Sequence, residues 1–176
     1  EHTTQLDLGG HWQSSAVQGS LAAFYAWHQH YLLIEKLPDI SASATNARSI
    51  EARSWGLESD WQYSLTEHWQ SLVTLAWVHA VNDTDHQPLA QQPPLEARLG
   101  VTYRHSQWST GLLLRLVDDQ NRVAIGQGTI VGQDIGQTPG FALLSINANW
   151  QPLEHINISV GIDNLFDRAY AEHVSK

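Results

Sequence analysis

Apolar and polar residues alternate along most of the chain, with the two-residue period of β-strands that turn one face away from water. The pattern is clearest near the end, where Ile156, Ile158, Val160 and Ile162 alternate with small or polar residues. Seven earlier stretches repeat the period, at 5–12, 20–31, 54–63, 73–78, 95–103, 108–116 and 142–150. The sequence therefore predicts an all-β fold of about eight strands.

The connections between these strands alternate in length. Short ones span 14–18, 66–68, 105–107 and 152–154, and long ones span 35–49, 81–93 and 118–139. Short turns on one side and long loops on the other indicate an antiparallel meander that forms one domain over residues 1–176. Outer-membrane barrels have this asymmetry, with short turns in the periplasm and long loops outside the cell.

Aromatic residues gather at the predicted strand ends. One group lies beside the short turns: Trp12, Trp61, Tyr63, Trp69, Tyr103, Trp108 and Trp150. A second group lies toward the long loops: Tyr25, Trp27, Tyr31, Trp55 and Trp77, with Tyr31 expected on the same face as Trp27. Amphipathic rings favour the membrane–water boundary, so two belts around an apolar band indicate lipid contact. A water-soluble β-sandwich, whose strands also alternate, is the alternative.

Composition narrows the classes of function. The chain holds 9 Lys and Arg against 18 Asp and Glu, a net charge of −9, which argues against nucleic-acid binding. It has no Cys, which excludes disulfides and thiolate metal sites, and it has no Met. Only 15% of residues are charged while Trp numbers 8, as suits a protein with an apolar surface against lipid. No apolar run approaches the length of a transmembrane helix.

Two histidine groups are candidates for metal binding. His28 and His30 stand two residues apart on the polar face of one strand, and His79, Asp83, Asp85 and His86 cluster at a long loop. We prefer the more ordinary interpretations, in which the two strand histidines face a water-filled lumen and the loop group is a solvated acidic loop. No metal ligand and no cofactor are assigned.

Other polar groups do not form a catalytic site. Glu58 and Asp60 could act as an acid–base pair, but no nucleophile is near, and we expect Arg98 or Arg115 to neutralise them. The stretch 126–140 is rich in Gly but lacks the Lys-Ser/Thr of a phosphate loop, so it predicts a long flexible loop. No residue is predicted to be catalytic, and the chain is not expected to be an enzyme.

The final strand runs into a distinctive phrase, VGIDNLFDRAY, at residues 160–170. It resembles the penultimate-strand signature of TonB-dependent outer-membrane receptors, carried here by Asp163, Asn164, Leu165, Phe166 and Asp167. EHTTQLDLG at 1–9 and ARSWGLESDWQYSLTEHW at 52–69 are similar to earlier strands of the same family. The stretches 93–103, 108–117, 132–150 and 163–175 look most like its copper-receptor subgroup.

This resemblance implies part of a 22-stranded transmembrane barrel in the outer membrane of a Gram-negative bacterium. It implies uptake of a scarce metal or metal chelate, copper being favoured, driven by the TonB–ExbB–ExbD complex. The family's plug domain, TonB box and final strand are expected outside these residues. Copper(I) favours Cys or Met ligands, so its ligands are also expected outside them.

The segment alone should leave two open sheet edges. A small free-standing outer-membrane barrel with a structural or adhesion role is a further alternative.

Overall fold

The computed structural model describes residues 1–37 and 44–174, which form one antiparallel sheet. Eight long strands pair in the order β1-β2-β3-β4-β6-β7-β9-β10. Their bounds are β1 His2–Gln13, β2 Val17–Lys36, β3 Thr45–Ser64, β4 Trp69–Asn82, β6 Glu96–Arg104, β7 Trp108–Val117, β9 Phe141–Leu153 and β10 Ile156–Ile162. Two short strands, β5 (Gln87–Pro88) and β8 (Gln127–Gly128), pair with β4 and β2. The predicted all-β meander of eight strands is confirmed.

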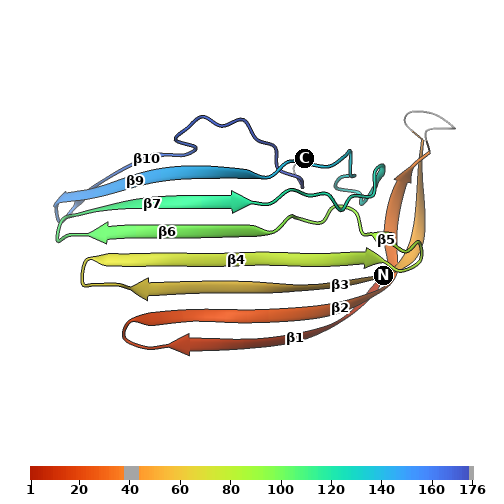
Figure 1. Ribbon diagram of the computed structural model, residues 1–176, viewed down its shortest axis with the longest axis horizontal. Coiled ribbons are helices and arrows are strands. Elements are labelled where there is room, and N and C mark those ends of the chain that lie inside the picture. Colours follow the sequence, from red (N-terminus) through yellow and green to blue (C-terminus); the bar gives the residue numbers. More distant parts are fainter. Residues whose placement is uncertain (38–43, 175–176) are drawn as a thin grey trace.

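The sheet is a single curved layer with its short turns at one end and its long connections at the other (Figure 1). We call these the short-turn end, on the left in Figure 1, and the long-loop end, on the right. Within the described residues β1 and β10 are the two edges and do not pair with each other. The single layer rules out a β-sandwich, and the open order rules out a closed eight-stranded barrel. No helix in the described part of the chain could cross a membrane.

The strand register confirms most of the predicted alternation. Leu8 pairs with Ala23, and Ala23 pairs with Leu57, so these apolar residues share one face, which is the convex face of the curved sheet. Leu8 is 78% exposed there, as a lipid-facing side chain would be without its lipid. Polar residues such as Glu58 and Arg98 lie on the concave face, where they line a pocket.

The alternation predicted through Tyr31 is wrong, because β2 contains a β-bulge. His28 pairs with Ala52 and Tyr31 pairs with Ile50, so one extra residue of β2 lies between these pairs. His30 adopts φ 56° there, and its backbone N–H donates to Glu51 Oε1 at 3.3 Å. A one-residue slip reverses the faces of a strand. Tyr31 therefore lies on the concave face with His28, not on the convex face with Trp27.

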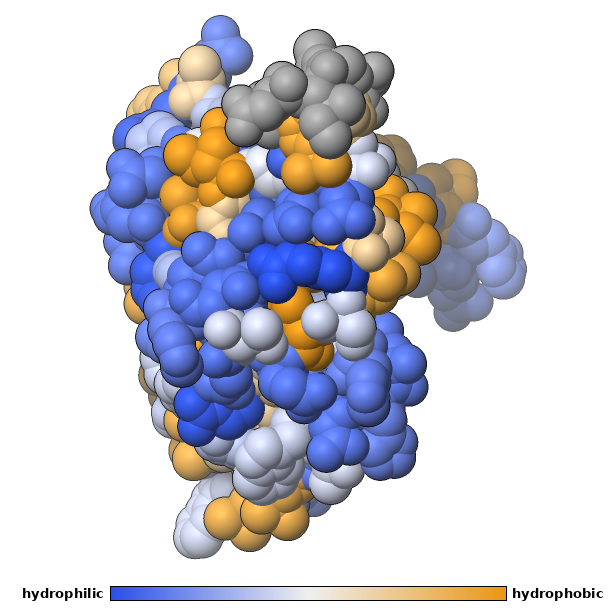
Figure 2. All heavy atoms as spheres, turned by 90° about the vertical axis from the view of Figure 1, so that its right-hand side faces the viewer, coloured by the Kyte–Doolittle hydropathy of each residue, from blue (hydrophilic) through white to orange (hydrophobic). Residues whose placement is uncertain are grey.

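Beyond the bulge, β2 and β3 extend past the other strands at the long-loop end (Figure 1). The predicted loop at 35–49 is therefore too long, although residues 38–43 lie outside the described residues. Tyr31 packs there against a buried apolar cluster of Leu33, Ile50, Ala52, Ala80 and Leu89. Viewed from this end, the surface is mainly hydrophilic with separate apolar patches (Figure 2). This end has a core of its own, built from strand extensions and loops.

Candidate functional site

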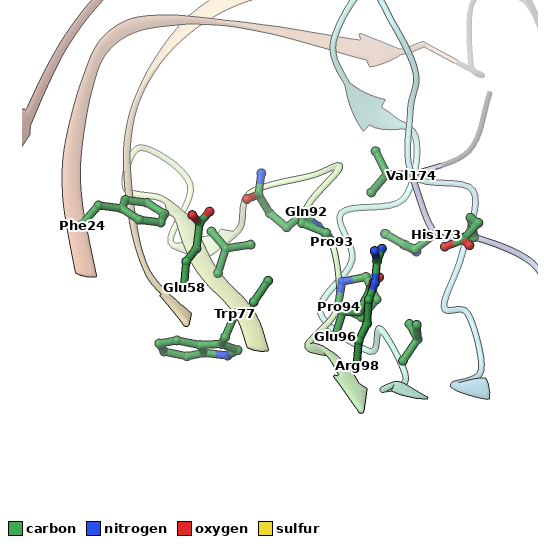
Figure 3. A pocket seen from close by; sticks show the side chains of 14 residues that line it. Phe24, Glu58, Trp77, Gln92, Pro93, Pro94, Glu96, Arg98, His173 and Val174 are labelled. Carbon is green, nitrogen blue, oxygen red and sulfur yellow. The ribbon is translucent and has the colours of Figure 1, made fainter. Parts of the chain in front are cut away.

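A pocket of about 760 Å³ lies on the concave face below the long loops (Figure 3). Strands β2, β3, β4 and β6 supply one side, and the connection at 92–94 and the C-terminal segment at 172–174 supply the other. Its polar lining includes Glu58, Gln92, Glu96, Arg98, Glu172 and His173. Apolar residues such as Phe24 and Val117 complete the lining, so the hollow has both charged and apolar walls.

The charges of this pocket are paired through Glu96 and Arg115. Arg98 Nε lies 2.6 Å from Glu96 Oε1, and Arg115 Nη2 lies 2.7 Å from Glu96 Oε2. Arg115 Nη1 also lies 2.5 Å from Glu172 Oε1, which ties the C-terminal segment to β7. The expectation that these arginines neutralise Glu58 and Asp60 is wrong, because their hydrogen-bonding groups are directed to Glu96 and Glu172.

A buried carboxylate, Asp134, joins the loops above the pocket. Its Oδ1 accepts the backbone N–H and the side-chain Nε2–H of Gln91, both at 3.0 Å, and its Oδ2 accepts the Ala124 N–H at 2.9 Å. His173 Nε2 approaches Oδ1 to 3.4 Å, while His173 Nδ1 lies 2.9 Å from Thr138 Oγ1. Sequence reasoning missed this residue, because one Asp in a Gly-rich loop has no periodic signal.

The stretch 126–140 lies in a long connection, as predicted, and its first residues pair with a distant strand. Gln127 and Gly128 form β8 against Glu35 and Ile34 of β2, and Lys36 N–H donates to Gly126 O at 2.9 Å. The β7–β9 connection therefore reaches across the concave face to a strand far away in the sheet order. It closes over the long-loop end and covers part of the concave face.

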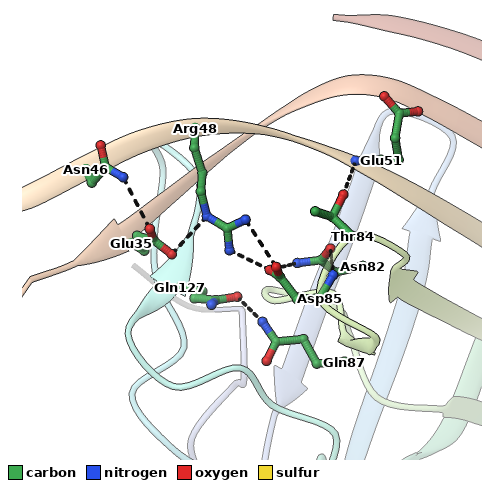
Figure 4. Close-up of polar contacts among 9 residues, drawn as sticks. All are labelled: Glu35, Asn46, Arg48, Glu51, Asn82, Thr84, Asp85, Gln87 and Gln127. Atoms are coloured by element: carbon green, nitrogen blue, oxygen red, sulfur yellow. Dashed lines mark hydrogen bonds and ion pairs between the residues drawn. The ribbon is translucent and has the colours of Figure 1, made fainter.

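A second polar network fixes the extension of β2 and β3 (Figure 4). Arg48 donates from Nε to Glu35 at 3.1 Å and from Nη2 to Asp85 at 2.5 Å. Asn82 Nδ2 donates to the same Asp85 oxygen at 2.6 Å. The Arg48 guanidinium lowers the pKa of Asp85 below its ordinary value, although partial burial acts in the opposite direction.

The loop cluster predicted as a possible cation site does not converge on one point, because three of its four residues contact three different arginines. Asp85 pairs with Arg48, Asp83 lies 2.6 Å from Arg53, and His79 Nδ1 lies 2.9 Å from Arg122 Nη1. His86 follows Asp85 in the same turn and has φ 55°. Within residues 1–37 and 44–174, no group of three or more His, Cys, Asp or Glu could hold a metal ion.

The pair of His28 and His30 is also separated, by the β-bulge. His28 is satisfied on both ring nitrogens, with Thr3 Oγ1 3.0 Å from Nδ1 and Ser54 Oγ 2.9 Å from Nε2. His30 stands at the bulge itself. The ordinary interpretation of His28 as a polar concave-face residue fits these contacts.

The aromatic residues of the short-turn end make lateral contacts across the strands. Ring centroids are 4.9 Å apart for Trp69 and Tyr103 and 5.2 Å apart for Tyr103 and Trp108. Trp108 is the register partner of Trp150. The remaining members, Trp61, Tyr63 and Trp12, continue this belt toward β1, since Trp61 stacks with Tyr63 and Trp12 pairs with Gly19 beside Trp61. Their contact with the membrane boundary stays a prediction.

The aromatic residues of the long-loop end form a smaller ladder on β2, β3 and β4. Tyr25 lies 4.5 Å from Trp27 and 5.9 Å from Trp55, measured between ring centroids. His79 joins Trp55 at 4.4 Å and Trp77 at 6.1 Å. Tyr31, which was expected in this group, is excluded by its place on the concave face.

The signature residues 163–167 turn the chain out of β10. Leu165 N–H donates to Leu144 O at 2.7 Å, and Asn164 Oδ1 accepts the Arg168 N–H at 2.9 Å. Asn164 and Asp167 have φ values of 51° and 47°, which Asn and Asp tolerate better than most residues. The turn directs the following residues to Arg115 and Asp134, so the signature has a structural role here.

An open antiparallel sheet with an apolar convex face, a polar concave face and asymmetric connections defines a piece of an outer-membrane β-barrel wall. The family model described as TonB dependent receptor-like, beta-barrel, matches residues 1–165. The chain belongs to this family, whose members are receptors and transporters of the Gram-negative outer membrane and not enzymes.

Individual relatives agree with this assignment. The pesticin receptors of Yersinia enterocolitica and Yersinia pestis are 26% and 25% identical, over 97% of this chain and 25% of their own length. The solved structure of the copper transporter OprC matches 99% of this chain and 26% of its own, with a TM-score of 0.95 and 37% identity. The FrpB iron transporter of Neisseria meningitidis matches 99% of this chain and 28% of its own, with a TM-score of 0.74 and 16% identity. The chain spans about a quarter of the length of these relatives.

Proposed function

We propose that this chain is the wall segment of a TonB-dependent transporter that takes up copper across the outer membrane. The observation that carries the proposal is the match to the copper transporter OprC, at a TM-score of 0.95 and 37% identity over 99% of this chain. The FrpB match, at a TM-score of 0.74 and 16% identity, supports the fold alone.

The segment's part in uptake is to shape the lumen and the outer opening. The concave face offers carboxylates and arginines to the lumen, and the loops joined by Asp134 cover the long-loop end. Soft Cys and Met ligands for copper(I) are absent from the sequence, so they would be supplied from outside these residues. Coupling to the TonB–ExbB–ExbD complex would likewise depend on parts outside them.

A second candidate is uptake of an iron chelate. It is considered because solved barrels of the same fold include iron transporters such as FrpB. The two candidates differ in cargo and share the barrel, the membrane and the energy source.

Metal accumulation in a strain deleted for the full gene distinguishes the two cargoes. We expect lower cellular copper under copper limitation, restored by the intact gene, with uptake of ferric chelates unchanged. A tonB deletion should reproduce the copper defect, because both changes remove the same energised step. Unchanged copper accumulation together with impaired ferric-chelate uptake would contradict the copper proposal and support the second candidate.

A further inference from the structure

Two histidines on neighbouring short turns bring their rings together at the short-turn end. His68 ends the β3–β4 turn and His105 begins the β6–β7 turn. Their ring centroids are 6.2 Å apart, with 34° between the ring planes. Both side chains are exposed to solvent. In outer-membrane barrels the short turns face the periplasm.

The backbone holds both turns in fixed register. Arg104 N–H donates to His68 O at 2.8 Å, which links the two turns directly. Thr66 Oγ1 accepts the N–H groups of His68 and Trp69 at 3.2 and 3.1 Å, which tightens the first turn. His105 N–H donates to Trp108 O at 2.8 Å and closes the second turn. The histidine backbones are therefore placed before any ligand binds.

The side chains leave ring nitrogens available. His105 Nδ1 lies 3.2 Å from Ser106 Oγ, which leaves Nε2 free to act as a ligand, and its ring stacks beside Trp108 at 5.9 Å. The His68 ring lies 5.7 Å from the Tyr103 ring. The described residues provide no hydrogen bond to the ring nitrogens of His68.

We propose that His68 and His105 form a two-imidazole site for a late first-row divalent metal ion, such as Cu²⁺, at the periplasmic rim. Metal–nitrogen bonds of about 2.0 Å place two ligating imidazole centres about 4.5 Å apart for a right angle at the metal and about 6.3 Å apart for a straight angle. The observed 6.2 Å corresponds to two imidazoles on nearly opposite sides of the ion. Imidazole suits this class of ion, and copper(II) binds most tightly in the series. Water would complete the coordination.

The charged residues next to the two histidines add no net charge to the proposed site. Glu67 precedes His68 and Arg104 precedes His105, so one negative and one positive residue adjoin the pair. This site is independent of the cargo, because it lies at the opposite end from the pocket and loops.

Titration of the full receptor chain in detergent with CuCl₂, followed by electron paramagnetic resonance, tests the site. We expect His68→Ala and His105→Ala each to weaken binding of one Cu²⁺ at least tenfold and to lower the number of coordinating nitrogens. His155→Ala is the matched control, since His155 is an exposed histidine on the neighbouring β9–β10 turn. It should leave the affinity and the spectrum unchanged.

His68→Gln and His105→Gln guard against a folding artefact, because they keep a polar side chain of similar reach. Both should retain the heat-dependent gel mobility of a folded barrel and still lose the Cu²⁺ signal. Equal Cu²⁺ affinity in the wild type and in both single variants would overturn the proposal. Loss of binding in His155→Ala to the same degree would overturn it as well.

Discussion

The two ends of this sheet are held together by different interactions. At the short-turn end the strands pair in continuous register except for one shift between β9 and β10 beside Ile156, turns of a few residues connect them, and aromatic rings contact one another across the convex face. At the long-loop end, β2 is bulged, loops fold back onto strands, and apolar residues are buried. The ion pairs found among the described residues lie in this half of the sheet.

Backbone conformation follows the same division. Within residues 1–37 and 44–174, the non-glycine residues with positive φ are His30, His86 and Gln91 at the long-loop end, and Asn164 and Asp167 in the turn after β10. Such conformations persist only where side-chain contacts hold them. The short-turn end is built from paired strands, short turns and aromatic contacts, whereas the long-loop end is a small folded structure with its own core. The long-loop end is thus the one whose shape depends on individual side chains.

The largest expected effect comes from removing the carboxylate that joins the loops. Asp134→Ala leaves the buried N–H of Ala124 and two partly buried N–H groups of Gln91 without their acceptor. Unpaired buried donors cost about 1–3 kcal/mol each, so the loops should lose roughly 3 kcal/mol or more of local stability. Amide hydrogen exchange within 118–140 should accelerate about a hundredfold.

Asp118→Ala is the matched control for this change. Asp118 lies on the same connection, is exposed, and accepts the adjacent N–H of Asp119. Its removal should change exchange within 118–140 only slightly. Exchange at the short-turn end should stay the same in both variants. If that end loosened together with the loops in Asp134→Ala, the two ends would not be separate structures.

The sequence predicted the short-turn end well because that end obeys periodic rules. The alternation of apolar and polar residues predicted which face of the sheet Leu8, Leu57 and Trp150 occupy. The short turns between aromatic residues predicted the hairpins. The long-loop end escaped prediction because its contacts join residues far apart in the chain. Asp134 bonds to Gln91, and Arg115 bonds to Glu172, 57 residues away.

The error at Tyr31 has the same origin. A bulge reverses the face of every later residue, and no residue type in Gln29 or His30 announces it. The signature at 163–167 was recognised by family resemblance, but its contact with Leu144 emerged only from the structure. Strand faces can be predicted from local sequence, whereas the pocket depends on pairings that sequence patterns do not specify.

A smaller effect is expected from a glycine at the short-turn end. Gly19 lies under Trp61, and an added Cβ would stand 2.5 Å from Trp61 Cε3 and 2.6 Å from Asp60 O. Gly19→Ala should therefore displace the Trp61 ring and strain the β2–β3 pair, at a cost of about 1–3 kcal/mol. The urea midpoint of unfolding in micelles, followed by Trp fluorescence, should fall.

The control for Gly19 is Gly10→Ala on the neighbouring strand β1. An added Cβ at Gly10 meets nothing within 4 Å. The free energy of unfolding of Gly10→Ala should stay within about 0.5 kcal/mol of the wild-type value. A fall as large as that of Gly19→Ala would mean that strand backbone, rather than the fit of Trp61, limits stability at this end.

The smallest expected effect is the acid sensitivity of the loop that carries Asp85. Its pKa is lowered in the folded protein by Arg48, so the ion pair stabilises the loop at pH values above the unfolded-state pKa of about 4. That contribution should stay constant from pH 7 to about 4 and disappear as the pH falls through the lowered pKa. Because both partners are partly exposed, the loss should be about 1 kcal/mol or less. Hydrogen exchange of residues 82–90, corrected for the intrinsic effect of pH, measures it.

Asp85→Asn should remove this loss of loop stability at low pH, which we call the acid step, while leaving Asn82 a hydrogen-bond partner. The control Glu154→Gln, at a short turn, should leave the acid step intact. An acid step of equal size in Asp85→Asn would assign the pH dependence to another carboxylate. A matching step among the amides of the short-turn end would contradict the division itself. That end draws its order from strand pairing and aromatic contacts, which carry no titrating carboxylate, and it should therefore be indifferent to acid over the range in which the loops loosen.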